Sequence, residues 1–264
     1  MVEHLVPDDL WVIVKTVIPA QTPRPHGGRT KIHARRTLAG ILYILRWGLP
    51  WRQLPLALGF GSGQTRERRF REWLRQGVWA RLLRLVLDYA ARQGALDWSR
   101  ASIDWASLPA PRGGVATGPN PTDRGKAGCK LHLLVDRQGL PLAVTISGAN
   151  VHDSRQLEAT LAAVQGVRNG KGGRPQRRPV KLHADKGYDY SRCRTALYQR
   201  GIVPRIARRG IESSNHLGRT AGEWNVLWCG CYRTGSWLWR GVCVSACGVT
   251  SSGPSNAKNT DAVQ

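Results

Sequence analysis

The sequence predicts an α/β protein with a mixed sheet flanked by helices, preceded by a helical, helix-turn-helix-like N-terminal domain. Two observations support this prediction. Apolar residues recur at helical spacing over much of residues 7–92. Short apolar runs replace that pattern from residue 99 onward, and they read as three strands, then helix, strand, helix and strand. Hairpin-linked strands followed by alternating helices and strands form a mixed sheet covered by helices. We expect the helical domain over residues 1–95 and the α/β domain over 96–219.

Two N-terminal helices are expected, over residues 7–18 and 33–47. In the second, four apolar side chains follow the i, i+3, i+4, i+7 spacing of a single helix face. They are Leu38, Ile41, Leu42 and Leu45. The sequence Gly48-Leu49-Pro50 then ends the helix, because proline cannot continue one.

An arginine-rich helix follows a glycine turn at residues 60–63. Over residues 64–74 we expect Phe70 and Trp73 to face inward and the arginines to face outward. A further helix is expected from residue 79 to about residue 92. Short helices with a glycine turn and an arginine-rich helix suit a module that places cations along a DNA groove, although a solvated helix surface has the same composition. The candidate DNA-binding residues are Arg66, Arg68, Arg69 and Arg71.

The charge balance indicates a polyanionic partner. The chain has 40 Lys and Arg against 17 Asp and Glu, a formal net charge of +23. Such an excess opposes compact folding unless a polyanion offsets it, so nucleic acid is the expected partner and a membrane surface the alternative. No apolar run approaches the roughly 18 residues of a spanning helix, and the N-terminus lacks the pattern of a signal peptide. We expect a cytoplasmic, nucleoid-associated protein without a membrane partner.

The α/β region begins with three expected strands, at residues 101–105, 129–136 and 141–147. A hairpin turn at residues 137–140 joins the last two. The expected later elements are a helix over 153–164, a basic loop over 168–178, a strand ending at Asp185, a helix over 190–200 and a strand over 202–207.

Two aspartates stand at the ends of expected strands. Asp104 lies in the first strand, and Asp185 follows the fourth strand and precedes a glycine turn. The ends of these strands can lie side by side in a mixed sheet, so Asp104 and Asp185 are expected to be neighbours. Carboxylates exposed by such a turn suit a hard divalent cation. Each aspartate taken alone also fits a turn residue or a helix cap.

Several sequence blocks resemble a known family. They are Thr-Gly-Pro-Asn-Pro-Thr-Asp-Arg-Gly-Lys at 117–126, Ser-Gly-Ala-Asn-Val-His-Asp-Ser at 147–154, His-Ala-Asp-Lys-Gly-Tyr-Asp at 183–189 and the stretch 205–214, with N-terminal blocks at 36–43, 47–52 and 60–63. In this order they resemble the transposases of bacterial insertion sequences, which carry an aspartate-aspartate-glutamate (DDE) site on a ribonuclease-H-like fold. The resemblance covers about residues 5–219.

The resemblance implies metal-dependent DNA transposition. Asp104 matches the first catalytic aspartate and Asp185 the second, and both would hold Mg²⁺, or Mn²⁺ in its place. Two such ions can stabilise the entering and leaving oxygens of an in-line attack on phosphate. The implied partner is double-stranded DNA carrying the terminal inverted repeats of the element, and a homodimer is the assembly considered.

The third carboxylate of the family is absent from its expected position. The family glutamate falls at position 225, which is Asn225 here. Glu223 comes two positions earlier, a rotation of about 200° on a helix, so it would point to the other side. If one base is restored after the codon of Arg219, the next residues can be encoded as His-Arg-Trp-Gly-Val-Glu-Arg, close to the family motif. We therefore hypothesise a one-base deletion that shifted the frame after Arg219.

The composition changes where this frameshift would begin. Residues 220–264 hold four of the six cysteines and four of the eleven tryptophans, without helical periodicity. We expect this stretch to be an aberrant, disordered tail. Its cysteines at 229, 231, 243 and 247 match no standard zinc-finger spacing.

Three functional hypotheses follow. The first is a transposase that has lost catalysis together with its third carboxylate. The second is a DNA-binding protein only, which acts as a repressor or inhibitor of transposition. The third is a nuclease that uses Glu212 or Glu223 as a substitute ligand.

Overall fold

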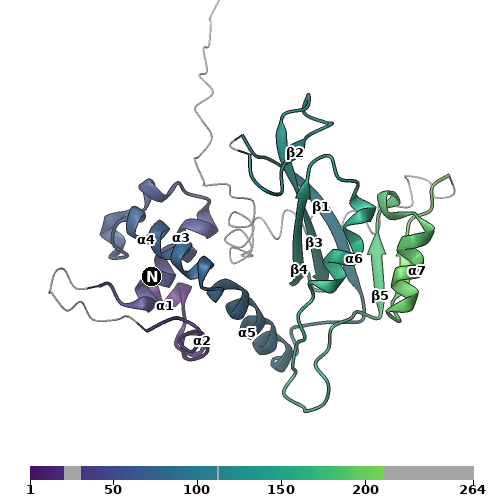
Figure 1. The fold of residues 1–264 in the computed structure, drawn as a ribbon. Helices are drawn as coiled ribbons and strands as arrows, with labels where there is room; N and C mark the ends of the chain where they lie inside the picture. Colours follow the sequence, from purple (N-terminus) through teal and green to yellow (C-terminus); the bar gives the residue numbers. More distant parts are fainter. Residues whose placement is uncertain (21–30, 112, 211–264) are drawn as a thin grey trace, which may run out of the picture. The chain divides into compact units, whose positions relative to one another are not determined.

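The computed structural model describes residues 1–20, 31–111 and 113–210, which form two compact units (Figure 1). The division falls between Gln76 and Gly77. The sequence suggested a boundary after residue 95, whereas in the structure the helix over residues 78–92 belongs to the second unit. Within the described ranges, none of the helices is both long and apolar enough to cross a membrane.

The first unit is helical, as expected. Its α-helices are α1 (Val2–Leu5), α2 (Asp8–Val14), α3 (Ala34–Trp47) and α4 (Gly63–Arg75), with short 3₁₀ turns η1 (Trp51–Gln53) and η2 (Leu56–Leu58). The His33 side chain caps α3 by accepting from the amide of Arg35 at 3.2 Å. Gly48 ends α3 in a left-handed conformation with φ 63°, which glycine adopts without strain.

The apolar spacing of α3 defines the core of the first unit. The four predicted side chains are buried, and Phe60, Phe70 and Trp73 are buried as well. Gly63, the first residue of α4, lies against η1. A Cβ atom at this position would come 1.5 Å from the carbonyl oxygen of Trp51, so only glycine allows α4 to begin there.

The second unit is built on one sheet with helices packed against it. The helices are α5 (Val78–Arg92), α6 (Leu157–Ala162) and α7 (Ser191–Gln199), with turns η3 (Asp153–Arg155) and η4 (Lys186–Tyr188). The strands are β1 (Ala101–Pro109), β2 (Gly118–Pro119), β3 (Ala127–Asp136), β4 (Pro141–Gly148), β5 (Lys181–Ala184) and β6 (Val203–Ile206).

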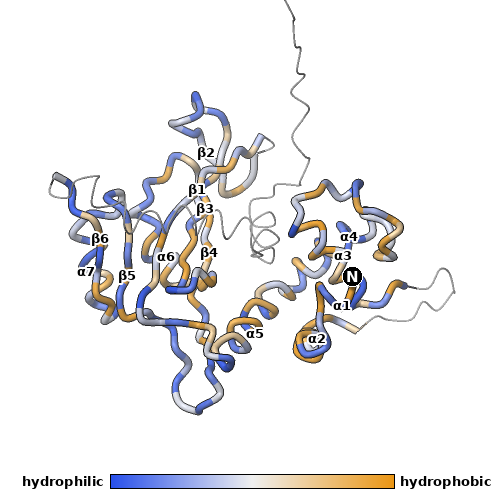
Figure 2. Tube along the Cα trace, turned by 180° about the vertical axis from the view of Figure 1, so that it is seen from behind, coloured by the Kyte–Doolittle hydropathy of each residue, from blue (hydrophilic) through white to orange (hydrophobic). Residues whose placement is uncertain are grey.

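The strand order confirms the predicted mixed sheet. The long strands run β4-β3-β1-β5-β6, with the short β2 also paired to β3. Strand β3 is antiparallel to β1 and β4, whereas β5 is parallel to both β1 and β6. A three-stranded meander extended by two parallel strands is the ribonuclease-H-like arrangement. In Figure 1, α6 lies over β3 and β4, and α7 lies alongside β5, while Figure 2 shows β6 next to α7.

One hydrophobic core joins the sheet to its helices. Ile103 of β1, Leu134 of β3 and Leu182 of β5 are fully buried and belong to the same cluster as Leu87 of α5. Leu157 of α6 and Leu197 of α7 complete it. Figure 2 shows the hydrophobic segments along the central strands and α5, and a hydrophilic loop between α6 and β5. The alternation along β1 therefore leaves Asp104 on the face opposite Ile103.

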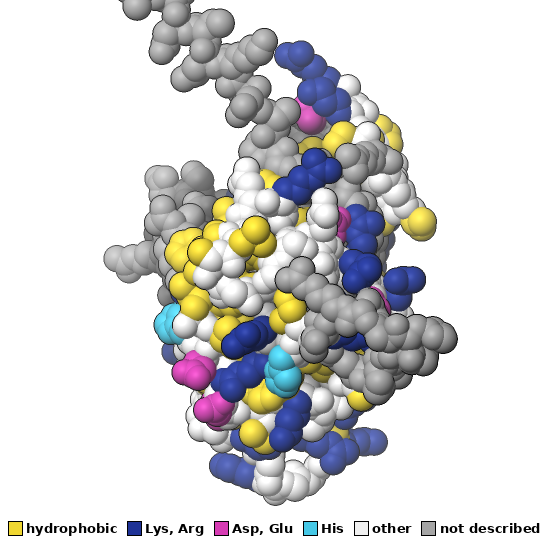
Figure 3. Space-filling model, turned by 90° about the vertical axis from the view of Figure 1, so that its left-hand side faces the viewer, with side chains coloured by type: hydrophobic (Ala, Val, Ile, Leu, Met, Phe, Trp, Pro, Cys, Tyr) yellow, Lys and Arg dark blue, Asp and Glu magenta, His cyan; other side chains and the backbone are white. Residues whose placement is uncertain are grey.

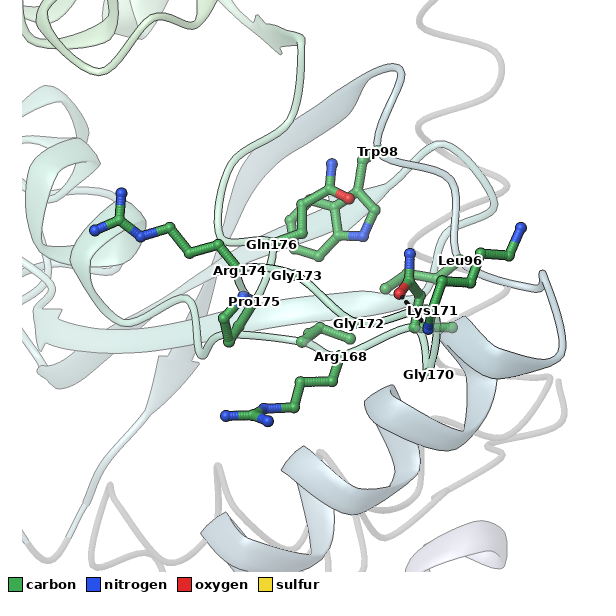
Figure 4. Close-up of a pocket in the computed structure, with 13 residues that line it drawn as sticks. Leu96, Trp98, Arg168, Gly170, Lys171, Gly172, Gly173, Arg174, Pro175 and Gln176 are labelled. Atoms are coloured by element: carbon green, nitrogen blue, oxygen red, sulfur yellow. Dashed lines mark hydrogen bonds between the residues drawn. The ribbon is translucent and has the colours of Figure 1, made fainter.

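The basic loop between α6 and β5 borders a hollow of about 420 Å³. Val167 and Gln176 pair across the base of the loop, and the amide of Arg168 donates to Asp88 of α5 at 2.8 Å. The side chains of Arg168, Lys171 and Arg174 extend in different directions (Figure 4). The loop is thus anchored at its base, and its cations do not converge on the hollow.

Candidate active site

The pairing of β1 with β5 places the two candidate aspartates at matching positions. Ala101 is opposite Leu182 and Ser102 is opposite His183 in this parallel pair. Asp104 and Asp185 follow Ser102 and His183 by two residues each, Asp104 within β1 and Asp185 just after β5 ends at Ala184. The charges of both aspartates act on the buried phenol of Tyr188, so both lie in the same region of the second unit. That their carboxylates are neighbours stays a prediction.

The turn after β5 holds Asp185 in place. Asp185 precedes η4, and one of its carboxylate oxygens accepts from the amide of Gly187 at 3.1 Å. A Cβ atom on Gly187 would come 3.0 Å and 3.3 Å from the two carboxylate oxygens, so glycine keeps the space beside the carboxylate open. Desolvation raises the pKa of Asp185, and the hydrogen bond from the Gly187 amide opposes this shift. The charge of Asp153 raises the pKa further, and Arg209 and His152 lower it slightly.

Tyr188 is a buried phenol close enough to three aspartates for their charges to affect its pKa. Its side chain is fully buried, and among the described residues its hydroxyl has no hydrogen-bond partner. Burial raises the pKa of Tyr188 well above its usual range, and the negative charges of Asp153, Asp185 and Asp104 raise it further. Both predicted site residues and a third aspartate, Asp153, thus contribute to the raised pKa of this one phenol.

Asp153 was missed as a site residue by sequence reasoning, although it lies within the 147–154 block. In the structure it is already engaged by Lys130. The ammonium of Lys130 lies 2.9 Å from Asp153 Oδ1 and 4.4 Å from the ring centre of Trp105. It also donates to the carbonyl of Val151 at 3.0 Å. This ion pair keeps Asp153 directed toward β3.

The two predicted aspartates fit a divalent cation by chemistry, since both offer carboxylate oxygens. Only Asp185 follows the end of a strand, whereas Asp104, predicted near a strand end, lies inside β1. In the part of the chain that the structure describes, no group of three or more His, Cys, Asp or Glu side chains is arranged to hold a metal ion. Glu212, Glu223, Asn225 and the four tail cysteines lie outside the described residues.

The predicted outward orientation of Arg66 is wrong. Its side chain is 1% exposed, and its guanidinium donates to Thr37 Oγ1 at 2.5 Å. Burial, with a smaller effect of Arg69, lowers the pKa of Arg66 to about 10. The reason is visible in the spacing, because Phe70 and Trp73 follow Arg66 at i+4 and i+7 on the inward helix face. Arg66 is a core residue of the first unit.

The other three candidate arginines of α4 face outward to different degrees. Arg68 and Arg71 are exposed and Arg69 is half-buried. Arg69 pairs with Glu72 at 2.8 Å, and Arg71 pairs with Glu67 at 2.7 Å. Figure 3 shows Lys and Arg side chains spread over one face of the molecule, with few acidic side chains between them. The helix keeps its basic surface without Arg66.

A ribonuclease-H-like sheet with one candidate aspartate inside β1 and the other directly after the parallel strand β5 is the arrangement expected of the DDE class. Residues 6–83 match the family model described as "Putative transposase of IS4/5 family (DUF4096)". Residues 99–224 match the one described as "Transposase DDE domain". The chain belongs to the IS4/5 family of DDE transposases.

Two curated relatives come from Burkholderia cepacia. The chain is 45% identical over 122 residues to "Putative transposase for insertion sequence element IS402", which is 46% of this chain and 54% of the relative. It is 38% identical over 123 residues to "Insertion element IS402 uncharacterized 16.2 kDa protein", which is 46% of this chain and 84% of that relative. The chain thus spans about half the length of the first relative.

Solved structures show more distant similarity. One is a piggyBac transposase synaptic complex with hairpin DNA, with 13% identity and a TM-score of 0.39 over 80% of this chain and 50% of the other. Another is a Mos1 transposase paired-end complex with the left transposon end, with 14% identity and a TM-score of 0.29 over 85% and 79% of the two chains. The strand order of the sheet, and not these distant similarities, identifies the ribonuclease-H-like fold.

Proposed function

We propose that this chain derives from a DNA transposase that binds the ends of an insertion sequence and catalyses metal-dependent strand cleavage and transfer. The observation that carries the proposal is the parallel pairing of β1 with β5, because Asp104 and Asp185 each lie two residues beyond a paired position of these strands. Family membership supports the reaction class. The net charge of +23 supports double-stranded DNA as the partner.

Asp104 and Asp185 are the residues that would hold Mg²⁺ or Mn²⁺, through carboxylate oxygens. When bound, such ions favour deprotonation of water or a 3′-hydroxyl and offset charge on the reacting phosphate. The turn at Gly187 presents the Asp185 carboxylate, and the strand β1 fixes the backbone of Asp104.

Metal binding tests this assignment directly. Asp104→Asn and Asp185→Asn remove a ligand charge each and keep the side-chain shape, so each should weaken Mn²⁺ binding by about tenfold or more. Electron paramagnetic resonance of free Mn²⁺ measures the binding. Asp123→Asn, in a loop outside the site, is the matched control and should bind like the parent chain. Unchanged Mn²⁺ affinity in both site variants would contradict the assignment.

We further propose that this copy binds DNA but no longer cleaves it, because the third carboxylate is replaced by Asn225. The match to the DDE domain ends at residue 224, which supports a break in the family pattern there. Purified protein should bind a duplex with the terminal repeats of its element and show no Mg²⁺-dependent strand cleavage. Cleavage as fast as that of an intact family member would contradict this proposal.

The alternative is a protein that acts only by binding DNA, as a repressor or inhibitor of intact copies. The separate compactness of the helical unit favours it, because DNA contact there does not require the aspartates. The double variant Asp104→Ala with Asp185→Ala separates the two functions. Repression of an intact element should persist in this variant if DNA binding alone is the function, and its loss would exclude the alternative.

A further inference from the structure

Two arginines and one histidine contact the ring of Tyr190, just beyond the turn that carries Asp185. The guanidinium carbon of Arg209 lies 4.9 Å from the ring centre of Tyr190, and that of Arg192 lies 5.4 Å from it. The ring of His152 meets the same ring edge-on at a centroid distance of 5.3 Å. We call Tyr190, His152, Arg192 and Arg209 the Tyr190 cluster.

The Tyr190 cluster is tied to the turn of Asp185 by hydrogen bonds. Arg209 Nε donates to the carbonyl of Lys186, the residue after Asp185, at 3.1 Å. Arg209 Nη2 contacts the Tyr190 hydroxyl at 3.2 Å. The Arg209 amide donates to Asp189 Oδ2 at 2.9 Å, which holds the segment after β6 against the same turn. The cluster therefore has a fixed position beside the Asp185 carboxylate.

The other side of the cluster is held by η3. Ser154 Oγ lies 2.8 Å from His152 Nδ1 and also accepts from Arg192 Nη2. The His152 Nε2 atom lies 3.4 Å from the Tyr190 hydroxyl. Three segments that are distant in sequence thus contribute to one surface: η3, the start of α7 and the residues after β6.

The nearby carboxylates are engaged elsewhere. Asp189 accepts from Arg194 at 2.6 Å, and Asp153 pairs with Lys130. Among the described residues, neither Arg192 nor Arg209 forms an ion pair with a carboxylate. Both side chains are exposed, as is His152. Two guanidinium groups held on one aromatic ring therefore present positive charge to the solvent next to Asp185.

Guanidinium groups match phosphate oxygens because their N–H donors form a planar fork. An exposed pair of them, fixed beside a metal-binding carboxylate, suits a phosphodiester that must approach that carboxylate. We propose that the Tyr190 cluster binds a backbone phosphate of DNA and positions the strand beside Asp185. This inference rests on the proposed function, because it takes DNA as the partner. It assigns Arg192 and Arg209 as positioning residues.

The salt dependence of DNA binding tests this proposal. Each phosphate contact contributes a slope of about −0.9 to the plot of log affinity against log salt concentration. Arg192→Gln and Arg209→Gln should each make the slope shallower, and the double variant should make it shallower by about 0.9, the share of one phosphate. The probe is a short duplex with the terminal sequence of the element, titrated by fluorescence anisotropy at a series of NaCl concentrations. Arg209→Lys keeps the charge and should retain most of the slope.

Arg205→Gln provides the matched control, because Arg205 is an exposed arginine of β6 outside the cluster. Its slope should equal that of the parent chain. An unchanged slope in the double variant, or an equal change in the Arg205 control, would overturn the proposal. If the parent chain does not bind the duplex at all, the proposed function fails instead.

Thermal melting distinguishes phosphate binding from a merely structural role. Arg192→Gln should melt close to the parent chain, since its guanidinium contacts Ser154 Oγ and the Tyr190 ring near the surface. If the double variant melts at a lower temperature than the parent chain, the salt slope of the Arg192→Gln single variant tests the proposal instead. A folded Arg192→Gln variant with the parent slope would overturn the role of Arg192 and with it the two-arginine site.

Discussion

At the scale of single residues, Arg66 shows how a charged side chain becomes part of a core. Its stem lies near Gly40 and Phe60, where a Cβ atom on Gly40 would come 2.9 Å from Phe60 and 3.2 Å from Arg66. Arg66 Nε has no hydrogen-bond partner among the described residues. The side chain thus contributes packing along its stem and one hydrogen bond at its tip.

Substitutions at Arg66 should separate packing from charge. Arg66→Ala leaves a cavity and should lower the free energy of unfolding by about 3 kcal/mol. Arg66→Met fills the same space without a buried charge and should keep most of the stability. Urea denaturation measures both, and Arg68→Ala on the exposed face is the control, with an expected change within about 0.5 kcal/mol. Equal losses in the Ala and Met variants would mean that the charge matters more than the packing.

The buried His132 side chain should make the free energy of unfolding depend on pH. Its ring is fully buried, and Nε2 lies 2.8 Å from Ser147 Oγ. Burial lowers the pKa of His132 from 6.5 to about 4, against an opposing effect of Asp153. The pKa of His132 is lower in the folded state than in the unfolded state, so the unfolded state binds more protons below pH 6.5. The contribution of His132 to the free energy of unfolding is therefore complete above pH 6.5. It falls by about 3 kcal/mol in total as the pH drops from 6.5 toward 4.

The measurement is the free energy of unfolding between pH 7 and pH 4 for the parent chain and for His132→Gln. The variant should lose the steep part of this dependence. His4→Gln, at the exposed N-terminus, should keep it. A parent-like pH profile in His132→Gln would show that another group causes the dependence.

At the scale of elements, the sequence allowed most helices and strands to be located but not all their lengths. The helices predicted at 33–47 and 64–74 are found within about a residue as α3 and α4. The strand predicted at 101–105 continues to Pro109, because β3 offers a pairing partner as far as Gly128. The helix predicted at 153–164 begins as the turn η3 and becomes helical only from Leu157.

The candidate site was predicted in part. Asp104 and Asp185 were predicted from signals that are local in sequence, an expected strand end for each and a glycine turn after Asp185. Asp104 lies inside β1 and not at its end, because the pairing with β3 extends the strand to Pro109. Asp153 was missed because its place near Tyr188 depends on how η3 packs on η4, which no local pattern encodes. The Tyr190 cluster was missed for the same reason. Arg66 could have been placed correctly, since its spacing to Phe70 was available.

The start of α4 gives a prediction at this scale. Gly63→Ala forces a methyl group into the carbonyl oxygen of Trp51, so α4 and η1 must separate. The variant should lose about 3 kcal/mol of stability in the first unit. Tryptophan fluorescence during urea unfolding would detect this, with the neighbouring surface change Gln64→Ala as control. Parent-like stability would indicate that η1 moves freely.

At the scale of the whole molecule, the proposed frameshift makes a genetic prediction. Insertion of one base after the codon of Arg219 should restore a glutamate at position 225 and with it the third metal ligand. The repaired protein should cleave terminal-repeat DNA in the presence of Mg²⁺, whereas the present chain should not. A gel assay with labelled DNA ends compares them, and the repaired chain with Asp185→Asn is the control. If the gene sequence does not encode the motif in the shifted frame, the hypothesis is wrong.

The division between Gln76 and Gly77 has a consequence for the fate of such elements in a genome. A helical unit with its own core does not need the chemistry of the other unit in order to stay folded. On the proposed function, damage to the catalytic half leaves copies that still occupy DNA ends. Each damaged copy then competes with the intact enzyme for those ends, so mutational damage to copies of the element reduces further transposition.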